Sequence, residues 1–546
     1  MWISSVEISN FRCISSLSLR FKEGVNILVG ENSVGKSSIF IAISKLVGST
    51  ASPDSIQFSS DDLRYGTFEK GEMKVSCKFE LSEQEQKQLL DRLLSSPMPM
   101  AEKTNLYKQL ARFLRFVELY FIQNEVETRI YSKIGPMVVQ RDFVSNTYRD
   151  GGPNRGSINQ LFGGLSSANL LETKIGTEPG LWNSNNVLKR IGALILSYFK
   201  TFDEFRARPV VSSRSNVIES MQGGQVPSVL LNLKSHTKSK QRNRYKKICA
   251  EFSNFIPSLA IEAVEPTPGG GVADVQFNEE GKDWPIPLAN IGAGIVELLT
   301  FLTNLVTQED QIYVLEEPEL HLHSQAKRRL NRLIKESANK NQIFVITHDE
   351  HFVDLDSLQG LIRLYTENHE TQAAFLPSNI SPILLALLKT AMKDVGKREA
   401  IFARGVLLVE DESQQRFITE CANKLSIDLD GAGITVLHVD GHDAFKPYRT
   451  LVEELKIPYI CFRDKKWGSP HTNPPETFRA LGMELEEFLE QAGFGALLVE
   501  AKHKVGTGKP RVAEYVASRL SKEQIPPLFS QLISDAVSLA KHKIVG

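Results

Sequence analysis

Two segments that would bind one nucleotide lie about 280 residues apart in this chain, and this gap constrains the fold. Residues 30–37 have the sequence Gly-Glu-Asn-Ser-Val-Gly-Lys-Ser, which matches the phosphate-loop pattern G-x-x-x-x-G-K-[ST]. Far downstream, the apolar run of residues 312–315 ends in the two carboxylates Glu316 and Glu317. A compact single-lobe P-loop enzyme closes such a site over a shorter stretch. We therefore expect a large insertion between the two strands.

The first segment has the context that a phosphate loop requires. It follows an apolar run at residues 25–29, which predicts a buried strand, and precedes an expected helix over residues 38–47. The glycines let backbone N–H groups turn toward phosphates, while the lysine reaches the β and γ oxygens and the serine offers its hydroxyl to Mg²⁺. A chance Gly-rich turn is the alternative interpretation. We predict that ATP or a related nucleotide is bound by Gly30, Asn32, Gly35, Lys36, Ser37 and Ser38.

The second segment supplies the carboxylates of the same site. Glu316 is expected to hold Mg²⁺ together with Ser37, and Glu317 to orient the attacking water. Glu316 stands where Asp is usual, which changes geometry more than chemistry because the longer side chain can reach the metal through water. A further buried strand at residues 342–346 leads to His348, which we predict to contact the γ-phosphate or to position water. A lone histidine at a strand end is more often structural.

A glycine-containing loop, Gly292-Ala293-Gly294, opens an apolar helical run at residues 296–306. A loop of this kind at a helix N-terminus can bind an anion. It resembles the signature loop of ABC-type ATPases, which is offered to the nucleotide of the opposite subunit, and this implies nucleotide contacts for Gly292 and Gly294. The usual Ser and Gln are missing here. A tight turn that enters a core helix is the alternative.

These motifs, together with residues 8–12 (Ile-Ser-Asn-Phe-Arg) and the run of residues 316–323 (Glu-Glu-Pro-Glu-Leu-His-Leu-His), resemble the ATPase of the OLD (overcoming lysogenization defect) family, which is related to RecF- and SMC-type proteins. The resemblance implies that Arg12 lies near the nucleotide and that the protein forms a homodimer or a higher even oligomer. It also implies that His321 and His323 are not a metal site, although their spacing alone would allow one.

The same resemblance requires a Toprim domain after the ATPase. Apolar runs at residues 405–409, 434–439 and 457–462 alternate with turns and helices, as a small parallel α/β sheet requires. Toprim nucleases cut phosphodiesters with Mg²⁺ or Mn²⁺ held by carboxylates, because the cation neutralises the phosphate and lowers the pKa of the attacking water. The resemblance implies Glu410 and Asp464 as metal ligands and Lys509 as the lysine that stabilises the transition state.

Two positions depart from the Toprim pattern. Gln414 and Lys466 stand where the family has acids, and a lysine beside a carboxylate cluster competes with a metal ion. Asp411, Glu412 and Asp443 could substitute, and Glu486 or Glu487, in the acidic run of residues 484–490, could be a further carboxylate. A solvated helix face is the alternative for that run. Whether the domain cuts nucleic acid stays open at this stage.

The net charge of −1 gives no overall attraction to nucleic acid, so any such attraction has to be local. The densest basic segment, residues 234–247, carries seven Lys or Arg on an expected loop and helix start. Phosphate neutralisation there would give salt-dependent, sequence-independent binding to DNA. A solvated helix face is an equal alternative. The candidate contacts are Lys238, Lys240, Arg242, Arg244, Lys246 and Lys247.

The chain of 546 residues is too long for one core. Its five scattered cysteines fit reduced thiols, and it has neither a signal peptide nor an apolar run that would cross a membrane, so we expect a cytoplasmic protein. We expect an α/β fold: an ABC/SMC-like P-loop ATPase with a helical insert, then a small α/β Toprim domain. The expected parts are residues 1–80 and 203–396 for the ATPase, 81–202 for the insert and 397–546 for the Toprim domain.

Within the expected insert, residues 186–200 place apolar side chains on one wide helix face. This face is the candidate for dimerisation, and packing on the chain's own ATPase is the alternative.

Three functions follow from these features. The first is an ATP-gated, metal-dependent DNA endonuclease of the OLD type, acting in defence against phage, sometimes with a separate partner protein. The second is an ATPase sensor or scaffold whose Toprim domain is inactive and which recruits or restrains an effector. The third is an SMC-like DNA-repair ATPase with a binding module. Gln414 and Lys466 favour the second, whereas Glu410, Asp464 and Lys509 favour the first.

Overall fold

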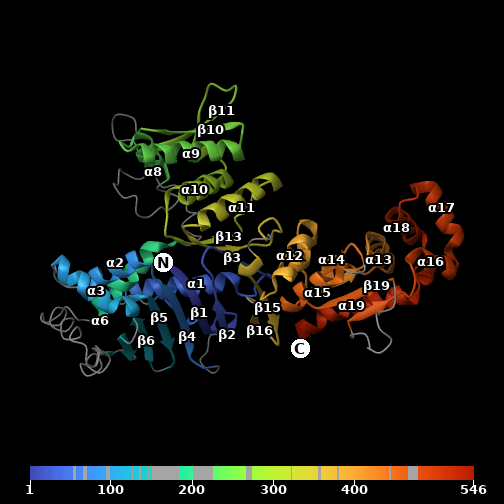
Figure 1. Ribbon diagram of the computed structural model, residues 1–546, viewed down its shortest axis with the longest axis horizontal. Helices are drawn as coiled ribbons and strands as arrows, with labels where there is room; N and C mark the ends of the chain where they lie inside the picture. The colour runs from blue at the N-terminus through green and yellow to red at the C-terminus, as the bar shows by residue number, and fades with distance from the viewer. Residues whose placement is uncertain are drawn as a thin grey trace. The chain divides into compact units, whose positions relative to one another are not determined.

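The computed structural model divides into two compact units (Figure 1). The first consists of Met1–Leu28 and Gly35–Thr347, and the second of Val29–Val34 and His348–Gly546. None of the helices in the described part of the chain has the length and apolar character needed to cross a membrane. The structure describes residues 1–52, 57–64, 71–93, 99–125, 127–134, 137–144, 147–149, 184–200, 226–265, 273–320, 322–353, 358–377, 380–441, 444–464 and 477–545.

The first unit contains an antiparallel sheet with the strand order β2-β1-β4-β5-β6-β7-β8. The strands are β1 (Trp2–Phe11), β2 (Ile14–Arg20), β4 (Met73–Glu80), β5 (Phe116–Gln123), β6 (Glu127–Ile134), β7 (Met137–Val144) and β8 (Thr147–Arg149). Alternate residues of β4 are buried, as expected for a sheet with one covered face. The alternation of residues 73–79 by itself predicts an antiparallel edge strand beside the phosphate-loop sheet, but this prediction is wrong, since β4 pairs on both sides, with β1 and β5, within a separate sheet. Alternation reveals the buried face of a strand but not its neighbours.

A parallel sheet carries the nucleotide motifs. In it β14 (Gln342–Ile346) lies between β3 (Val25–Gly30) and β13 (Ile312–Glu316), and β9 (Phe199–Lys200) pairs with β13. The central strands are almost entirely buried, which explains why they are continuous apolar runs. Segments about 280 residues apart thus reach one sheet because β14, which follows β13 in the chain, pairs in parallel with β3.

Helices cover this sheet and connect its strands. The phosphate loop leads into α1 (Lys36–Ala51), while α10 (Ala293–Thr307) precedes β13 and α11 (Ser324–Ala338) links β13 to β14. Beside α10 lie α8 (Val226–Ser235) and α9 (Ser239–Phe255), and a small antiparallel sheet packs on these two helices, as Figure 1 shows. The strands of that sheet are β10 (Leu259–Val264), β11 (Asp274–Glu279) and β12 (Ile286–Pro287).

The helix proposed for dimerisation, α6 (Ser184–Tyr198), packs on its own unit. Its apolar residues Leu188, Ile191, Leu194 and Ile195 are at most 1% exposed. At Gly192 a side chain would meet the backbone of Ala51 in α1 at less than 3.0 Å, so the two helices touch closely. These four residues therefore pack on the chain's own first unit, as the alternative interpretation of the sequence predicts.

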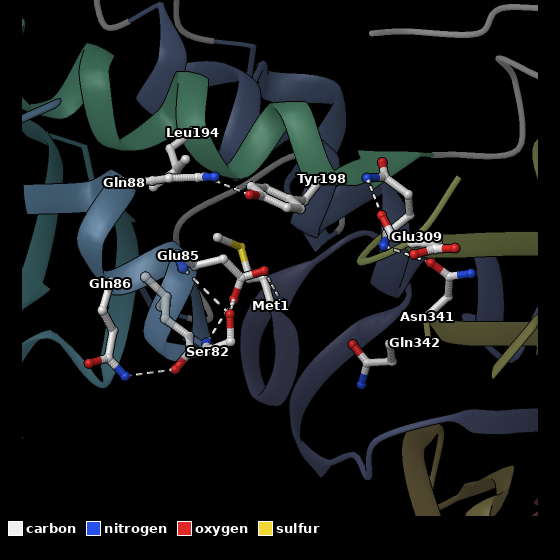
Figure 2. Close-up of polar contacts among 12 residues, drawn as sticks. Met1, Ser82, Glu85, Gln86, Gln88, Leu194, Tyr198, Glu309, Asn341 and Gln342 are labelled. Carbon is white, nitrogen blue, oxygen red and sulfur yellow. Dashed lines mark hydrogen bonds and ion pairs between the residues drawn. The ribbon is translucent and has the colours of Figure 1, made fainter. Parts of the chain in front are cut away.

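Polar contacts fix the start of the chain against the first unit, as Figure 2 shows. The Met1 amino group pairs with Glu85 of α2 (Glu83–Leu93), which packs beside α3 (Met100–Leu114). The backbone N–H and the hydroxyl of Ser82 donate to the same carboxylate at 2.7 and 2.9 Å, as the capping-box pattern Ser-Glu-Gln-Glu of residues 82–85 predicts. On the other side, the Gln342 side chain forms two hydrogen bonds with the Ile3 backbone and ties β14 to β1.

The second unit is built on a four-stranded sheet with the order β18-β17-β19-β20, in which every pair is parallel. This confirms the predicted small parallel α/β sheet. Its strands are β17 (Gly405–Val409), β18 (Ile434–His438), β19 (Tyr459–Arg463) and β20 (Phe478–Ala480). Its helices are α12 (Pro382–Ala391), α13 (Glu412–Leu425), α14 (Leu429–Ala432), α15 (Phe445–Glu454), α16 (Leu485–Leu489), α17 (Gly495–Val505), α18 (Lys509–Arg519) and α19 (Pro527–Val545).

A hairpin of β15 (Leu361–Glu367) and β16 (Glu370–Phe375) is attached to that sheet by a buried arginine. Arg363 of β15 is 4% exposed and donates to the carbonyl oxygens of Ala403 at 3.1 Å and Leu455 at 3.3 Å. Burial lowers the pKa of Arg363 to about 10. The hydroxyl of Thr371 in β16 donates to the Val34 carbonyl at 3.1 Å, so the same hairpin also contacts the phosphate-loop segment of its unit.

Candidate nucleotide and metal sites

The phosphate loop has a backbone that only glycine fits at two points. Gly30 and Gly35 have φ angles of 145° and 101°, in the region that L side chains rarely adopt. A side chain at Gly30 would also come within 3.0 Å of the Leu364 carbonyl. Lys36 opens α1 and is 8% exposed, while Asn32 and Ser33 face solvent. The loop therefore has the tight path that a phosphate-binding loop needs.

Ser37 and Glu316 meet directly, although they are 279 residues apart. The Ser37 hydroxyl donates to the Glu316 carboxylate, so the two predicted magnesium ligands lie side by side. Register explains this contact: Glu316 pairs with Ile346, and Ile346 pairs with Leu28, so the three strands end at one edge of the sheet. A hydroxyl and a carboxylate are the oxygen ligands that Mg²⁺ prefers, so these residues fit the ion that accompanies a nucleotide.

Glu317 and His348 follow the ends of adjacent strands. Glu317 has a φ angle of 46°, and its N–H donates to the Ile346 carbonyl at 2.7 Å, which fixes its backbone just beyond β13. His348 is exposed and follows Thr347, whose hydroxyl donates to Glu319 at 2.6 Å. The roles assigned to Glu317 and His348 stay predictions.

Arg12 lies in the turn between β1 and β2, near the phosphate loop. A side chain at Gly35 would meet the sulfur of the neighbouring Cys13 at 3.0 Å. The Arg12 guanidinium pairs with the buried Asp62 at 3.1 Å, and Lys45 pairs with the same carboxylate. Although burial acts in the opposite direction, the hydrogen bonds from Lys45, Ser59 and Arg12 lower the pKa of Asp62. Asp62 therefore holds Arg12 in place, while 35% of the Arg12 side chain stays exposed.

The signature-like loop is exposed at the start of α10. Gly292 is the N-cap residue of that helix, without a side-chain cap, and Gly294 lies in its first turn. The loop borders a cavity of about 380 Å³ whose other walls are Phe255, Ile256, Leu322 and His323. The His323 Nδ1 accepts from the Ala326 N–H at 3.3 Å, so this histidine caps α11. His321 lies outside the described residues.

In the second unit, Glu410, Gln414 and Asp464 form one hydrogen-bonded group. Glu410 follows β17 and Asp464 follows the adjacent β19. The Asp464 N–H donates to the Glu410 carboxylate at 3.0 Å. The Gln414 amide donates to the Asp464 carboxylate at 2.5 Å and accepts from the Glu410 N–H at 2.9 Å. Two carboxylates at neighbouring strand ends fit a divalent cation, and Gln414 lies where a third ligand would stand.

The electrostatics of this group resemble those of a metal site without its cation. Burial, together with the charges of Glu410, Asp411 and Glu484, raises the pKa of Asp464 to about 6, against the hydrogen bond from Gln414. Crowded carboxylates of this kind are relieved by a bound cation. The sequence pattern alone did not single out Glu484.

Lys509 lies at the edge of this group. Its ammonium contacts Glu484 at 3.1 Å and Glu486 at 3.5 Å, and these carboxylates raise the pKa of Lys509. The structure thus brings Lys509 together with Glu486, one of the two carboxylates selected in the acidic run. Lys509 lies 25 positions after Glu484 in the sequence, so the two residues meet only through tertiary packing.

Two of the substitute carboxylates have other tasks. Asp411 caps α13 by accepting from the Gln414 N–H at 2.9 Å, and Glu412 pairs with Arg416 at 2.8 Å on an exposed helix face. Asp443 and Lys466 lie outside the described residues.

The basic segment of the first unit spans the end of α8 and the start of α9. Lys238, Lys240, Lys246 and Lys247 are exposed there. Two of the six candidates are engaged within the protein. Arg242 donates to the carbonyls of His236 and Thr237 at 2.6 and 2.7 Å, and Arg244 pairs with Glu309 at 3.4 Å. The four lysines are thus the members whose charges extend into solvent.

Comparison with known families assigns both units. A family model described as an AAA ATPase domain matches residues 1–144 and 167–353. A second, described as the TOPRIM domain of overcoming lysogenization defect protein-like sequences, matches residues 401–465. The chain belongs to the OLD family. The predicted fold class of this OLD protein is thereby confirmed, whereas the exact limits of its parts stay predictions.

Relatives of this OLD protein are distant. The OLD nuclease of Thermus scotoductus is 26% identical over 267 residues, which are 44% of this chain and 50% of the relative. The match thus spans half the length of that curated relative. Among solved structures, the C-terminal region of the Burkholderia pseudomallei OLD protein is 23% identical and covers 25% of this chain and 99% of its own, with a TM-score of 0.22. The SMC head domain from Thermotoga maritima is 14% identical and covers 69% and 100%, with a TM-score of 0.32.

Proposed function

We propose that this OLD protein is an ATP-gated, divalent-metal-dependent DNA endonuclease that works in the cytoplasm as a homodimer or a higher even oligomer. The observation that carries this proposal is the group of Glu410, Gln414 and Asp464, in which two carboxylates converge at adjacent strand ends. The raised pKa of Asp464 supports it, because a carboxylate crowded by other carboxylates gains from a cation.

The gate is the nucleotide site. Lys36 and the loop glycines would hold the phosphates, and Ser37 and Glu316, already in contact, would hold Mg²⁺. Glu317 orients the attacking water and His348 contacts the γ-phosphate. Arg12, held by Asp62, adds a positive charge beside the loop. Gly292 and Gly294 of one protomer cover the nucleotide of the other, so that ATP binding closes the dimer.

The cutting site would use Mg²⁺ or Mn²⁺ held by Glu410 and Asp464. The cation neutralises the scissile phosphate and lowers the pKa of the attacking water. Lys509, beside Glu484 and Glu486, is close enough to the carboxylates to approach the charge that develops on the phosphate. The lysines Lys238, Lys240, Lys246 and Lys247 add sequence-independent contacts to DNA. We further propose a role in defence against phage, with a separate partner protein.

A second candidate is an ATPase sensor or scaffold whose TOPRIM domain does not cut. Gln414 favours it, because a neutral amide bonds to both Glu410 and Asp464 where an acid would add a ligand. Such a domain would hold its fold without metal and would restrain or recruit an effector.

Plasmid cleavage separates the two candidates. Purified protein is incubated with supercoiled plasmid and ATP in Mg²⁺ or Mn²⁺, beside the Asp464→Ala and Lys36→Ala variants. Asp283→Ala, which changes an exposed turn, serves as the control. The nuclease proposal requires nicking that Asp464→Ala abolishes and that Lys36→Ala makes independent of ATP. Absence of nicking under every condition, with ATP turnover intact, would support the scaffold instead.

A further inference from the structure

Four cations follow one another where α17 ends and α18 begins in the second unit. Lys502 and Lys504 lie in the last turn of α17, and Lys509 and Arg511 in the first turn of α18. All four are exposed, and we call them the basic strip. The connecting glycines Gly506 and Gly508 face open space, since a side chain there would meet nothing within 4 Å. Figure 1 shows α17 and α18 side by side, so the four residues of the strip lie on two neighbouring helices joined by a short turn.

Among the residues that the structure describes, three members of the strip have no carboxylate as a counter-charge. Across the described ranges, no carboxylate lies within ion-pair distance of Lys502, Lys504 or Arg511. Several arginines of the same unit, in contrast, are paired with carboxylates. Arg416 contacts Glu412 and Glu514, Arg479 contacts Asp535 and Arg519 contacts Glu500.

Helix stability accounts for only part of this arrangement. Cations in the last turn of a helix stabilise it, which explains Lys502 and Lys504. A cation in the first turn destabilises the helix, because the helix dipole is positive there. Lys509 is compensated by Glu484 and Glu486, but Arg511 has no such compensation. The charge of Arg511 therefore has its use outside the helix.

The strip is fixed to the same core as the candidate metal ligands. Ala501 of α17 and Val512 of α18 belong to one hydrophobic cluster with two strand residues, Val409 and Phe462. Val409 immediately precedes Glu410, and Phe462 lies two positions before Asp464. Lys509, a member of the strip, contacts Glu484 at 3.1 Å. The cations thus border the carboxylate group instead of lying on an unrelated face.

We propose that the basic strip binds the phosphate backbone of duplex DNA and guides one strand to the Glu410 and Asp464 carboxylates. This inference rests on the proposed function and names how its substrate is held. A row of exposed cations beside the carboxylate group fits a polyanion such as DNA, whose phosphates are regularly spaced. The strip would neutralise the flanking phosphates, and the metal ion at the carboxylates would bind the scissile phosphate.

The test is DNA binding by the full chain carrying Lys502→Glu, Lys504→Glu and Arg511→Glu together. The probe is a fluorescent DNA duplex in Ca²⁺, and its anisotropy gives Kd over a range of salt concentrations. We expect Kd to rise about tenfold or more, and the salt dependence of log Kd to fall by about two to three units, since each phosphate contact contributes about 0.9. ATP turnover should be unchanged.

Two further variants keep the test decisive. The matched control carries Lys393→Glu, Lys446→Glu and Lys522→Glu, three exposed lysines of the same unit, and should bind as the wild type does. The conservative variant carries Lys502→Arg, Lys504→Arg and Arg511→Lys and should also keep its affinity, which excludes a folding defect as the cause.

The outcomes separate this inference from the proposed function. Wild type that binds duplex without cutting it, with binding lost in the strip variant, supports the strip and overturns the nuclease. Wild type that cuts, with a strip variant that binds and cuts equally well, overturns the strip alone. Wild type that fails to bind duplex, or that binds only RNA, overturns the strip as well.

Discussion

The guanidinium of Arg404 lies 2.9 Å from the carboxylate of Glu31, although the two residues are 373 positions apart. Glu31 follows Gly30 in the phosphate loop, and Arg404 precedes Gly405, the first residue of β17. Both belong to the second unit. The Arg404 N–H also donates to the Gly433 carbonyl at 2.9 Å, at the start of β18. The ion pair therefore joins the loop that would sense nucleotide to the strand that ends at Glu410.

Breaking this ion pair should uncouple the two sites without unfolding the protein. Both side chains are 41% exposed, so the pair itself contributes only about 0–1 kcal/mol to stability. We expect Arg404→Glu to keep ATP binding but to weaken the stimulation of DNA cleavage by ATP. The double variant Glu31→Arg with Arg404→Glu restores the pair in reverse and should recover the stimulation. Cleavage rates with and without ATP measure this.

Arg449→Glu, which breaks an exposed ion pair with Glu453 in the same unit, is the control for that experiment. Equal loss of ATP stimulation in the control and in Arg404→Glu would contradict a specific role for the Glu31 pair. Failure of the double variant to recover would do so too.

Replacement of Glu317 by Gln should trap nucleotide. The isosteric amide keeps the backbone fixed by the Ile346 hydrogen bond but cannot accept a proton from water. We expect ATP turnover to fall about 10²- to 10⁴-fold with Kd for ATP nearly unchanged. Turnover and equilibrium binding of a fluorescent ATP analogue measure both quantities. Lys36→Ala should instead abolish binding, and a Glu317→Gln protein with normal turnover would exclude Glu317 from the reaction.

Much of the site could be predicted because its signals are local. Gly30 and Gly35 need their conformations within a single loop, and the loop directly precedes the helix it starts. Glu410 and Asp464 each follow an apolar run, and parallel strands align their carboxyl ends at one edge of a sheet. Their convergence follows from the sequence once the sheet is recognised.

Other features depend on packing that the sequence does not reveal. Glu31 meets Arg404, and Glu484 meets Lys509, only because helices and strands distant in the chain fold together. The apolar face of α6 was recognised from its spacing, yet spacing does not show whether a face packs on its own chain or on a second copy. The role of Gln414 could not be seen in the same way, because a neutral replacement in a family pattern indicates loss and not a new hydrogen bond.

Gln414→Glu should strengthen metal binding in the TOPRIM domain. The new carboxylate replaces a donor that bonds to Asp464 at 2.5 Å and would bring a third negative oxygen ligand to the group. We expect Kd for Mn²⁺ to fall about tenfold, since added ligand charge raises cation affinity. Calorimetric titration of Mn²⁺ into nucleotide-free protein measures it.

Gln531→Glu is the matched control for Gln414→Glu, because Gln531 likewise donates to a carboxylate, that of Asp535, on an exposed helix face. Its affinity for Mn²⁺ should equal that of the wild type. Unchanged affinity in Gln414→Glu would show that the group around Asp464 does not bind the cation.

Without metal, the stability of the protein should depend on pH through Asp464. Its pKa is raised from 3.8 to about 6, chiefly by burial. Between these values the folded protein holds a proton that the unfolded chain has released, so stability falls as the pH rises from about 4 to about 6. Asp464→Asn should flatten this part of the profile of Tm against pH, whereas an unchanged profile would contradict it.

Gly192→Ala should destabilise the first unit by overpacking the contact between α6 and α1. The added methyl group would meet the Thr50 and Ala51 backbone at less than 3.0 Å, and backbone cannot move aside as a flexible side chain can. Such overpacking typically costs about 1–3 kcal/mol, which exceeds the gain of about 1 kcal/mol that alanine brings to a helix. Thermal unfolding in the presence and absence of ATP measures the change.

Gly495→Ala in α17 is the control. Its methyl group would lie at ordinary contact distance, with the nearest atom at 3.6 Å, so this variant should be neutral or stabilising. Equal stability of the Gly192→Ala protein would mean that α6 is not packed on α1, and its apolar face would again be a candidate for dimerisation.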